Sequence, residues 1–329
     1  MCGFMPTRNS GLTPTTRPEF ELIERLRSVV GSHPRIPLGI GDDAAALACD
    51  GGRETLVATD MLLDGVHFLV DECGPYLAGR KALAVNLSDL AAMGGRGLAS
   101  FVSIALPHSQ PMSWADELMQ GVIDLGAEWN CPVTGGDTNS WNGPLVINVA
   151  VVGETLQPQS IRRSGAKPGD AIVVTGALGG SIHGRHLRFT PRLEEAAELL
   201  RIASPHAMID ISDGLSSDIQ HILAASGVGA RIEAAAIPVH PDVTLHSGLA
   251  GLHSEDRQAW LTHALNDGED FELLFTLPLG DWERLQAEWR HPTPLTRIGV
   301  VTEGQGCMLV GNSGESVPLT AGGYVHQFG

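Results

Sequence analysis

Residues 38–68 read LGIGDDAAALACDGGRETLVATDMLLDGVHF. Among glycine and small apolar residues this stretch carries Asp42, Asp43, Asp60 and Asp64, with His67 close behind. A carboxylate with such neighbours is expected in a turn at the end of a buried segment, rather than on a solvated face. Several such carboxylates in one place repel each other unless a cation lies between them. The stretch therefore predicts an acidic turn to which other acidic turns of the chain are brought, with Mg²⁺ held among them.

The composition predicts a two-domain α/β protein. The chain has 329 residues, of which 43% are hydrophobic and 40 are glycine, enough for two cores and many tight turns. Its formal net charge is −17, which argues against nucleic acid and anionic membranes as partners. The only lysines are Lys81 and Lys167, so bridging metal ions would have to neutralise any bound phosphates.

The cysteines and the N-terminus indicate a cytoplasmic protein. The five cysteines are scattered without a C-x-x-C pair, which argues against a thiolate metal site and a disulfide framework and for a reducing compartment. No apolar run reaches the length of a membrane span. Residues 1–17 lack the apolar core of a signal peptide and are expected to form a flexible arm.

Hydrophobic periodicity predicts helices and strands in alternation. Helices are expected at 19–30, 75–93, 112–129, 215–225 and 282–289. Strands are expected at 55–59, 98–106, 144–153, 171–175, 208–211, 271–277 and 295–301, and another strand is expected to run into the double glycine before Asp137. The polar, turn-rich segment 157–170 suggests a boundary between an N-terminal domain (18–156) and a C-terminal domain (157–329).

Further acidic residues follow the other expected strands. Asp137 follows Gly135 and Gly136, while Asp210, Ser212 and Asp213 precede the helix 215–225. Ser212 or Asp213 could instead be the N-cap of that helix. The glycine-rich turn at 176–181 could present N–H groups to phosphate or be a plain tight turn, and both readings stay open.

Two short motifs suggest that the halves of the chain are related. NLSDL (86–90) and DISDGL (210–215) share the order polar residue, aliphatic residue, serine and aspartate, on or entering a helix. On the helix 75–93, Asn86 and Asp89 share one face, and its apolar flanks favour burial over a solvated polar stripe. We expect two α/β domains that face one cleft.

The residue types favour metal-assisted phosphoryl transfer. Carboxylates without clustered histidine or cysteine favour Mg²⁺ over zinc, and their spread over several turns argues against an EF-hand. The chain has no G-x-S-x-G motif and no cysteine in a basic setting, so no residue is assigned as a covalent catalyst or general base. Positioning and charge neutralisation are then the expected source of catalysis.

Several longer motifs occur together and in order along the chain. They are GIGDD (39–43), TD (59–60) with His67, KALAVNLSDLAAMG (81–94), GGDT (135–138), RSGAKPGD (163–170), IDISDGL (209–215) and GED (268–270). With these motifs the chain resembles the thiamine-monophosphate kinase family from about residue 19 onwards. The resemblance implies a PurM-like two-domain fold, with an N-terminal mixed sheet and a C-terminal α/β domain.

The family resemblance also implies an activity and a set of site residues. It implies transfer of the γ-phosphoryl group of ATP to thiamine phosphate, giving thiamine diphosphate, by a homodimer built through first-domain strands. The implied Mg²⁺ ligands are Asp43, Thr59, Asp60, Asp89, Asp137, Asp210 and Asp213. The implied ATP contacts are Gly136, Asp137, Arg163 and Ser212, and the implied thiamine contacts are His67 and Glu269.

A phosphate acceptor needs no general base. Its second pKa is about 6, so it is largely dianionic at neutral pH. The obstacle is repulsion between two polyanions, since unit charges at about 4 Å interact by about 4 kcal/mol at an effective dielectric constant of about 20. Direct in-line transfer without a phosphoenzyme is therefore expected. The sequence does not decide whether K⁺ is also required.

The chain departs from the family pattern at two places. Ala321 stands where the family carries an aromatic residue that packs on the substrate, three residues before Tyr324. The segment 181–191 leaves little room for the helix that usually follows the glycine-rich loop.

Two alternative functions stay open. One is another enzyme of the same fold, of the selenophosphate or aminoimidazole ribonucleotide synthetase type. The other is a non-catalytic nucleotide-binding homologue that has kept the fold.

Overall fold

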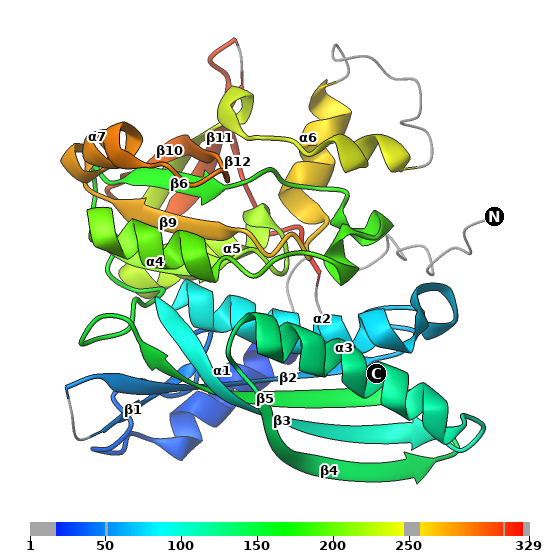
Figure 1. Cartoon of the computed structure of the whole chain (residues 1–329). Helices are drawn as coiled ribbons and strands as arrows, with labels where there is room; N and C mark the ends of the chain where they lie inside the picture. Colours follow the sequence, from blue (N-terminus) through cyan, green and yellow to red (C-terminus); the bar gives the residue numbers. More distant parts are fainter. Residues whose placement is uncertain (1–17, 50–51, 247–256, 312, 325–329) are drawn as a thin grey trace.

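The computed structural model describes residues 18–49, 52–246, 257–311 and 313–324, so the expected arm at 1–17 lies outside the described residues. Two β-sheets lie one above the other, with helices between and around them (Figure 1). The α-helices are α1 (Pro18–Val30), α2 (Val70–Ala92), α3 (Met112–Glu128), α4 (Leu193–Ile202), α5 (Leu215–Ser226), α6 (Arg257–Asn266) and α7 (Leu279–Glu288). Short 3₁₀ turns are η1 (Ser181–His183), η2 (Arg185–Leu187), η3 (Ala234–Ala236) and η4 (Pro241–Leu245).

The first sheet comes from the N-terminal half of the chain. Its strands are β1 (Ala45–Ala48), β2 (Glu54–Leu63), β3 (Gly95–Pro107), β4 (Val133–Trp141) and β5 (Val146–Thr155), in the order β1-β2-β5-β3-β4. Neighbouring strands are antiparallel, except that β3 and β4 are parallel. In β5 the sequence VINVAVVGET alternates half-buried and buried residues, so one face is covered and the other is partly open.

The second sheet comes from the C-terminal half. Its strands are β6 (Ala171–Thr175), β7 (Ala207–Asp210), β8 (Gly229–Glu233), β9 (Leu273–Leu277), β10 (Leu295–Thr302), β11 (Gly306–Val310) and β12 (Ser316–Pro318), in the order β12-β11-β8-β10-β6-β9-β7. The central strands β6 (AIVVT) and β9 (LLFTL) are buried at every position because helices cover both faces. Alternate residues of β6 pack into different cores, Val173 with α4 and α7, and Ile172 with α5 and α6.

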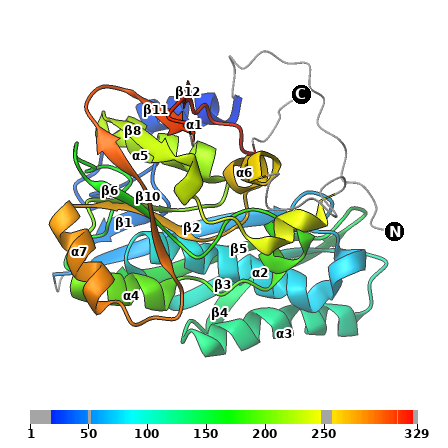
Figure 2. The ribbon, with the colours of Figure 1, turned by 90° about the horizontal axis from the view of Figure 1, so that it is seen from above.

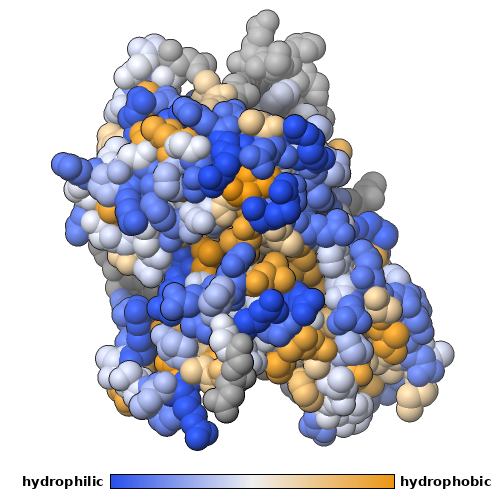
Figure 3. Space-filling model, turned by 60° about the vertical axis from the view of Figure 1, so that its left-hand side comes forward, coloured by the Kyte–Doolittle hydropathy of each residue, from blue (hydrophilic) through white to orange (hydrophobic). Residues whose placement is uncertain are grey.

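Helix α2 lies between the two sheets and joins them into one core. It bends at Gly74, where φ is +77°, and is buried over most of its remaining length. The view from above shows the second sheet lying across α2 and the first sheet (Figure 2). On the face drawn in Figure 3, hydrophobic side chains gather where the two halves meet, between hydrophilic surfaces. The core around α2 includes residues of both sheets, such as Leu56 and Phe275.

A pair of glycines sets the close crossing of α2 and α3. A Cβ at Gly79 would lie 2.0 Å from the carbonyl oxygen of Leu118, and a Cβ at Gly121 would lie 2.0 Å from that of Tyr76. Each helix backbone therefore occupies the space that a side chain on the other would need. This contact places α3 against the first half of α2.

Most expected elements are present, with differences at their ends. Strand β2 continues to Leu63, so Asp60 lies inside the strand and not at its end as expected. Likewise β4 continues through Gly135 and Gly136 to Trp141. Residues 181–187 form two 3₁₀ turns, in agreement with the expected lack of room for a helix. Strands β1, β8, β11 and β12 and helices α4 and α6 were not predicted. No helix among the described residues combines the length and apolarity that a bilayer crossing requires.

The domain boundary at 156/157 stays a prediction. The first sheet ends at Thr155 and the second begins at Ala171, on either side of the expected boundary. One core nevertheless includes residues from both halves of the chain.

We predict that Gly121→Ala lowers the free energy of unfolding by about 1–3 kcal/mol, because the new methyl group must push α2 and α3 apart. Gly280→Ala is the matched control. A Cβ at Gly280 in α7 would have no atom of the described residues within 4 Å, so alanine there should stabilise by about 0.4–1 kcal/mol. Urea denaturation of both variants measures the difference. Equal effects at the two glycines would contradict the assigned role of the α2–α3 contact.

Candidate active site

Three carboxylates from distant parts of the chain meet between the two sheets. Asp43 lies in the turn before β1, Asp89 lies on α2, and Asp210 is the last residue of β7. One oxygen from each of the three lies within 4.8 Å of the others. The side-chain hydroxyl of Ser88 donates a 2.6 Å hydrogen bond to Asp210 Oδ2, so the two related motifs, NLSDL and DISDGL, contact each other directly.

The protein environment disfavours the charged form of these carboxylates. Burial, followed by the charge of Asp43, raises the pKa of Asp210 to about 8. Burial and the charges of Asp60 and Asp210 raise the pKa of Asp89 well above its usual value. Burial also raises the pKa of Asp43. These groups become fully ionised only if positive charge is supplied to them.

Arg163 supplies part of that charge. Its Nη2 lies 2.6 Å from Asp43 Oδ1, and its backbone N–H donates to the side chain of Asp42. The second oxygen of Asp43, Oδ2, is buried and has no hydrogen-bond partner among the described residues. One guanidinium thus faces several buried carboxylates, and an oxygen donor is left over.

Asp60 adjoins this cluster from β2. Burial raises its pKa, with a further contribution from Asp43, while a hydrogen bond with Asp89 acts in the opposite direction. The neighbouring Thr59 is exposed, and its Oγ1 accepts a 3.1 Å hydrogen bond from Asn148 Nδ2.

Gly136 and Asp137 lie on β4, farther from the cluster. The register pairs Asp60 with Val149, Val149 with Val102, and Val102 with Gly136, which is a span of three strand spacings, roughly 14 Å. Asp137 is exposed and accepts hydrogen bonds from the backbone N–H of Thr138 and the side chain of Asn139. The structure does not bring the Asp137 side chain to Asp43, Asp89 and Asp210, and its metal role stays a prediction.

Ser212 and Asp213 follow β7 at the start of α5. The N-cap position is Gly214, which makes no side-chain capping bond, so neither Ser212 nor Asp213 is the N-cap. The first turn is instead closed by Asp218, whose Oδ2 accepts from the backbone N–H groups of Asp213 and Gly214. The carboxylates of Asp213 and Asp218 and the ring of His221 form a second group within 4.8 Å.

A cavity of about 460 Å³ opens beside the carboxylate cluster and is lined by both halves of the chain. From the first half come Asp60, Met61, Leu62, Val66, His67, Lys81, Val85 and Asp89, and from the second half come Ile182, Asp210, Ser212, Asp213, Asp267, Glu269, Phe271 and Tyr324. The cleft between the halves that the repeated motifs suggested is therefore present.

The fully buried Lys81 organises one wall of the cavity. Its Nζ donates to the backbone oxygen of His67 (2.7 Å) and to Glu269 Oε1 (2.7 Å), and it lies 2.8 Å from His186 Nδ1. Burial alone would raise the pKa of Glu269, but the charge of Lys81 and the contact with His186 lower it to about 2. Glu269 is therefore an anion, and Lys81 fixes it relative to the segment that carries His67.

The backbone on this wall is strained. Glu269 and Phe271 have φ values of +55° and +51°, which side-chain-bearing residues rarely adopt. Phe271 stacks on Phe189 with ring centroids 4.2 Å apart. These contacts hold the Glu269 side chain at the cavity.

Ala321 lies elsewhere. It borders a separate hollow together with Gln220, Cys307 and Met308, whereas Tyr324 lines the cavity. The aromatic ring at this end of the cavity is therefore that of Tyr324.

The glycine-rich turn after β6 is not free to bind phosphate through its central N–H groups. The backbone N–H of Gly179 donates to both oxygens of Asp270, and that of Gly180 donates to Asp267. Of the two readings left open by the sequence, the structure supports the plain turn.

Sequence reasoning missed several residues of this region. Lys81 and His186 hold Glu269, and Tyr324 lines the cavity. Lys81 had a visible signal, since it is one of only two lysines and lies in an apolar helix. His186 had none, because it meets Lys81 across 105 residues of sequence.

The carboxylate cluster fits a hard divalent cation. Its donors are all oxygens, burial raises the pKa values of the carboxyl groups, and Asp43 Oδ2 has no hydrogen-bond partner among the described residues. Mg²⁺ takes a few carboxylates and completes its shell with water and phosphate oxygens. Asp43, Asp89 and Asp210, with Asp60 beside them, are suited to that role.

Comparisons with known proteins show the family to which the chain belongs. Residues 41–155 match the family model "AIR synthase related protein, N-terminal domain". The chain is 38% identical to the thiamine-monophosphate kinase of Rhodopirellula baltica, over 86% of this chain and 89% of that protein. It is 37% identical to the thiamine-monophosphate kinase of Escherichia coli K12, over 94% of this chain and 98% of that protein.

Solved structures give the same result. AaThiL complexed with AMPPCP and TMP is 30% identical with a TM-score of 0.79, covering 96% of this chain and 100% of that one. The thiamine-monophosphate kinase of Stenotrophomonas maltophilia is 35% identical with a TM-score of 0.70, covering 91% of this chain and 98% of that one. The expected PurM-like fold is confirmed, and the chain belongs to the thiamine-monophosphate kinase family.

Proposed function

We propose that this chain transfers the γ-phosphoryl group of ATP to thiamine phosphate, giving thiamine diphosphate and ADP. The observation that carries the proposal is the buried group Asp43, Asp89 and Asp210 beside a cavity of about 460 Å³. The relative AaThiL was solved with AMPPCP and TMP, which supports the same pair of ligands here.

Metal binding is assigned to the acidic residues. Asp43, Asp60, Asp89 and Asp210 would hold Mg²⁺ at the centre, with Thr59 and Asp213 beside them and Asp137 farther away on β4. When bound, Mg²⁺ neutralises phosphate charge and so allows donor and acceptor to approach each other. The raised pKa values of the central carboxylates support this assignment, because these groups need positive charge in order to ionise.

Nucleotide binding is assigned to Gly136, Asp137, Arg163 and Ser212. Arg163 lies against Asp43, so its guanidinium is already at the place where phosphate would meet the metal-binding carboxylates. At Gly136 a Cβ would lie 1.8 Å from the carbonyl oxygen of Val102, so only glycine keeps β3 and β4 in this register. Ser212 lines the cavity two residues after Asp210.

Thiamine binding is assigned to the wall held by Lys81. His67 and Glu269 line the cavity, and the Glu269 carboxylate is kept anionic to accept hydrogen bonds from the substrate. Tyr324 supplies an aromatic face for the cationic ring of thiamine, in place of the aromatic residue missing at position 321.

No protein residue forms a covalent intermediate in this scheme. The acceptor phosphate is already a nucleophile, and the described residues need only align donor and acceptor and balance their charge. The first experiment is to incubate the purified chain with ATP, Mg²⁺ and thiamine phosphate and to measure thiamine diphosphate. Absence of that product under these conditions would reject the proposal in favour of a non-catalytic homologue or another enzyme of this fold.

We predict that Asp89→Asn lowers kcat/KM at least about 100-fold, because it removes one of the carboxylates that hold the metal and the loss is worth several kcal/mol. Without Mg²⁺ the same change should raise Tm, because a neutral amide replaces a buried carboxyl group that lies close to other carboxylates. With Mg²⁺ the increase in Tm should be smaller than in the wild type, because the ion is bound more weakly.

Asp116→Asn is the control for that variant, since Asp116 is exposed on α3. It should leave kcat/KM and the Mg²⁺-dependent Tm increase unchanged. An Asp89→Asn protein that keeps the wild-type Tm increase with Mg²⁺ would show that the cluster is not the metal site.

We predict that Tyr324→Ala raises KM for thiamine phosphate by about tenfold, the equivalent of 1.4 kcal/mol, with little change in KM for ATP. Ala321→Ser should change neither constant, because Ala321 borders a separate hollow. Steady-state kinetics with each substrate varied in turn gives both values. A larger effect at position 321 than at 324 would reverse the assignment of this wall.

The protein is further proposed to act as a cytoplasmic homodimer through the first sheet. Phe101 on β3 and Trp141 on β4 are 42% and 44% exposed, and the register places both on the face of the sheet away from α2. Large exposed hydrophobic side chains on one face of a sheet are typical of a protein–protein interface, and a second copy of the chain is the proposed partner.

We predict that Phe101→Glu shifts the protein from dimer to monomer in sedimentation equilibrium, because a charge is placed inside the interface. Met112→Glu is the control, since Met112 is 77% exposed at the start of α3, outside the sheet. Wild-type protein that sediments as a monomer at all concentrations would refute the dimer.

A further inference from the structure

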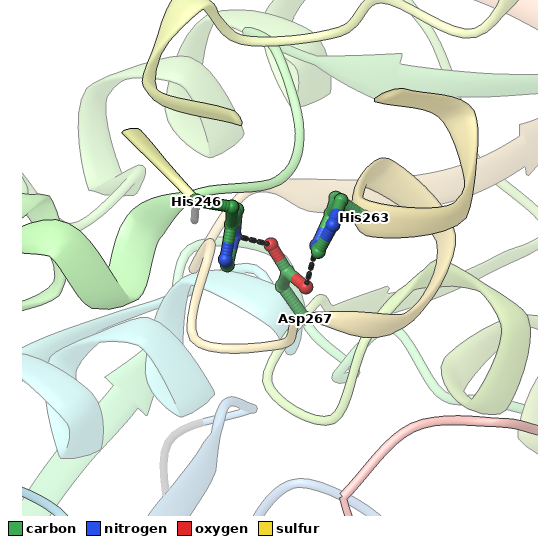
Figure 4. A group of neighbouring side chains, drawn as sticks. All are labelled: His246, His263 and Asp267. Atoms are coloured by element: carbon green, nitrogen blue, oxygen red, sulfur yellow. Dashed lines mark hydrogen bonds and ion pairs between the residues drawn. The ribbon is translucent and has the colours of Figure 1, made fainter. Parts of the chain in front are cut away.

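A third group of side chains that could hold a metal ion lies outside the carboxylate cluster. His246 follows η4, His263 lies on α6, and Asp267 follows the same helix (Figure 4). His246 Nε2 lies 2.8 Å from Asp267 Oδ2, and His263 Nδ1 lies 2.8 Å from Asp267 Oδ1. Both rings therefore direct a nitrogen at one carboxylate.

The geometry of this group is compact. One ligand atom from each of the three residues lies within 4.8 Å of the others. The rings of His246 and His263 stack with centroids 3.8 Å apart, and the ring of His183 from η1 meets His246 edge-on at 4.3 Å. Two imidazoles thus contact the carboxylate directly, and a third packs against the ring of His246.

A backbone hydrogen bond also fixes the Asp267 carboxylate. Asp267 Oδ2 also accepts a 2.8 Å hydrogen bond from the backbone N–H of Gly180. Gly180 fits tightly at this point, since a Cβ on it would lie 2.4 Å from the backbone of Asp242. Hydrogen bonds of this kind orient ligands in metal sites, and here one fixes Asp267 before any ion is bound.

The donor set separates this group from the acidic cluster. Imidazole nitrogens with a single carboxylate suit Zn²⁺ and similar transition metals, whereas Mg²⁺ prefers oxygen ligands only. The proposed Mg²⁺ ligands Asp43, Asp89 and Asp210 form a different group and share no member with this one.

We propose that His246, His263 and Asp267 form a binding site for a divalent transition-metal ion. Each histidine presents its lone pair after its proton moves to the other ring nitrogen, so the ion replaces the protons now shared with Asp267. Asp267 and Ile182 also line the cavity, which places the ion at the edge of the proposed substrate site.

Co²⁺ is the probe, in the presence of excess Mg²⁺ to occupy the acidic cluster. A four-coordinate site containing nitrogen donors gives strong visible absorption, whereas a six-coordinate all-oxygen site gives weak absorption. The full-length protein should develop the strong bands with about one Co²⁺ per chain, and Zn²⁺ should displace the Co²⁺ and abolish them.

Variants test whether Co²⁺ binds at His246, His263 and Asp267. His263→Gln and, independently, His246→Gln should each weaken Co²⁺ binding at least about tenfold. His108→Gln is the matched control, because His108 is exposed at the end of β3 in the other sheet, and it should bind as the wild type does. Asp89→Asn should keep the bands, so that loss of the proposed kinase site is distinguished from loss of this one.

The results decide between a metal site and a hydrogen-bonded cluster that only holds the chain together. Strong bands in wild type, His108→Gln and Asp89→Asn, lost in both histidine variants with unchanged circular dichroism, support the proposal. Wild-type protein without such bands in excess Mg²⁺ overturns it. Equal binding by the two histidine variants and the His108→Gln control also overturns it.

Discussion

The repulsion among buried carboxylates is the constraint on which the rest of this structure depends. Asp43, Asp89 and Asp210 lie together between two sheets, and their pKa values are raised by burial and, for Asp89 and Asp210, by their acidic neighbours. Arg163 balances part of this charge through Asp43. A protein that keeps such an unfavourable group does so at a cost in stability, and functional sites are where costs of this kind are concentrated. The cluster is therefore better explained by binding than by folding.

The fold supplies the rigidity that this group needs. Asp89 lies on α2, which is buried between the sheets and held against α3 by the close contacts at Gly79 and Gly121. Asp210 ends a strand that is buried at every position, and Ser88 binds it directly. Carboxylates on flexible segments would move apart to relieve their repulsion. Here the surrounding core prevents that movement, so the repulsion is relieved either by protonation, as the raised pKa values show, or by a bound cation that keeps the groups ionised.

The sequence predicted the helices and strands that a periodic pattern within the segment itself determines. It missed those that depend on contacts with segments far away in the sequence. The helix at 75–93 and the strand at 171–175 are decided by periodicity and apolar runs, and both were predicted closely. The turn that carries Asp42 and Asp43 was predicted because an aspartate among glycine and apolar residues is informative by itself, whereas Asp60 and Asp137, expected after strands, lie inside β2 and β4. Strands β8 and β11 are short and pair with each other across a long stretch of sequence, and β12 has only three residues, so their local signal is weak. The contacts of Lys81 with His186 and Glu269 depend on separations of 105 and 188 residues, which no local pattern records.

The two ends of the cavity differ in chemistry, and the difference follows from charge. At the acidic cluster, carboxylates outnumber the one guanidinium beside them, which suits metal ions and the phosphates that they bring. At the other end, Lys81 balances Glu269, and the neighbouring surface is formed by Phe271 and Tyr324. A ligand with a phosphate at one end and a cationic aromatic group at the other would satisfy both ends at once. The orientation of such a ligand is therefore set by the protein before binding, since reversing it would place a phosphate against Glu269 and leave the proposed metal site without an anionic partner.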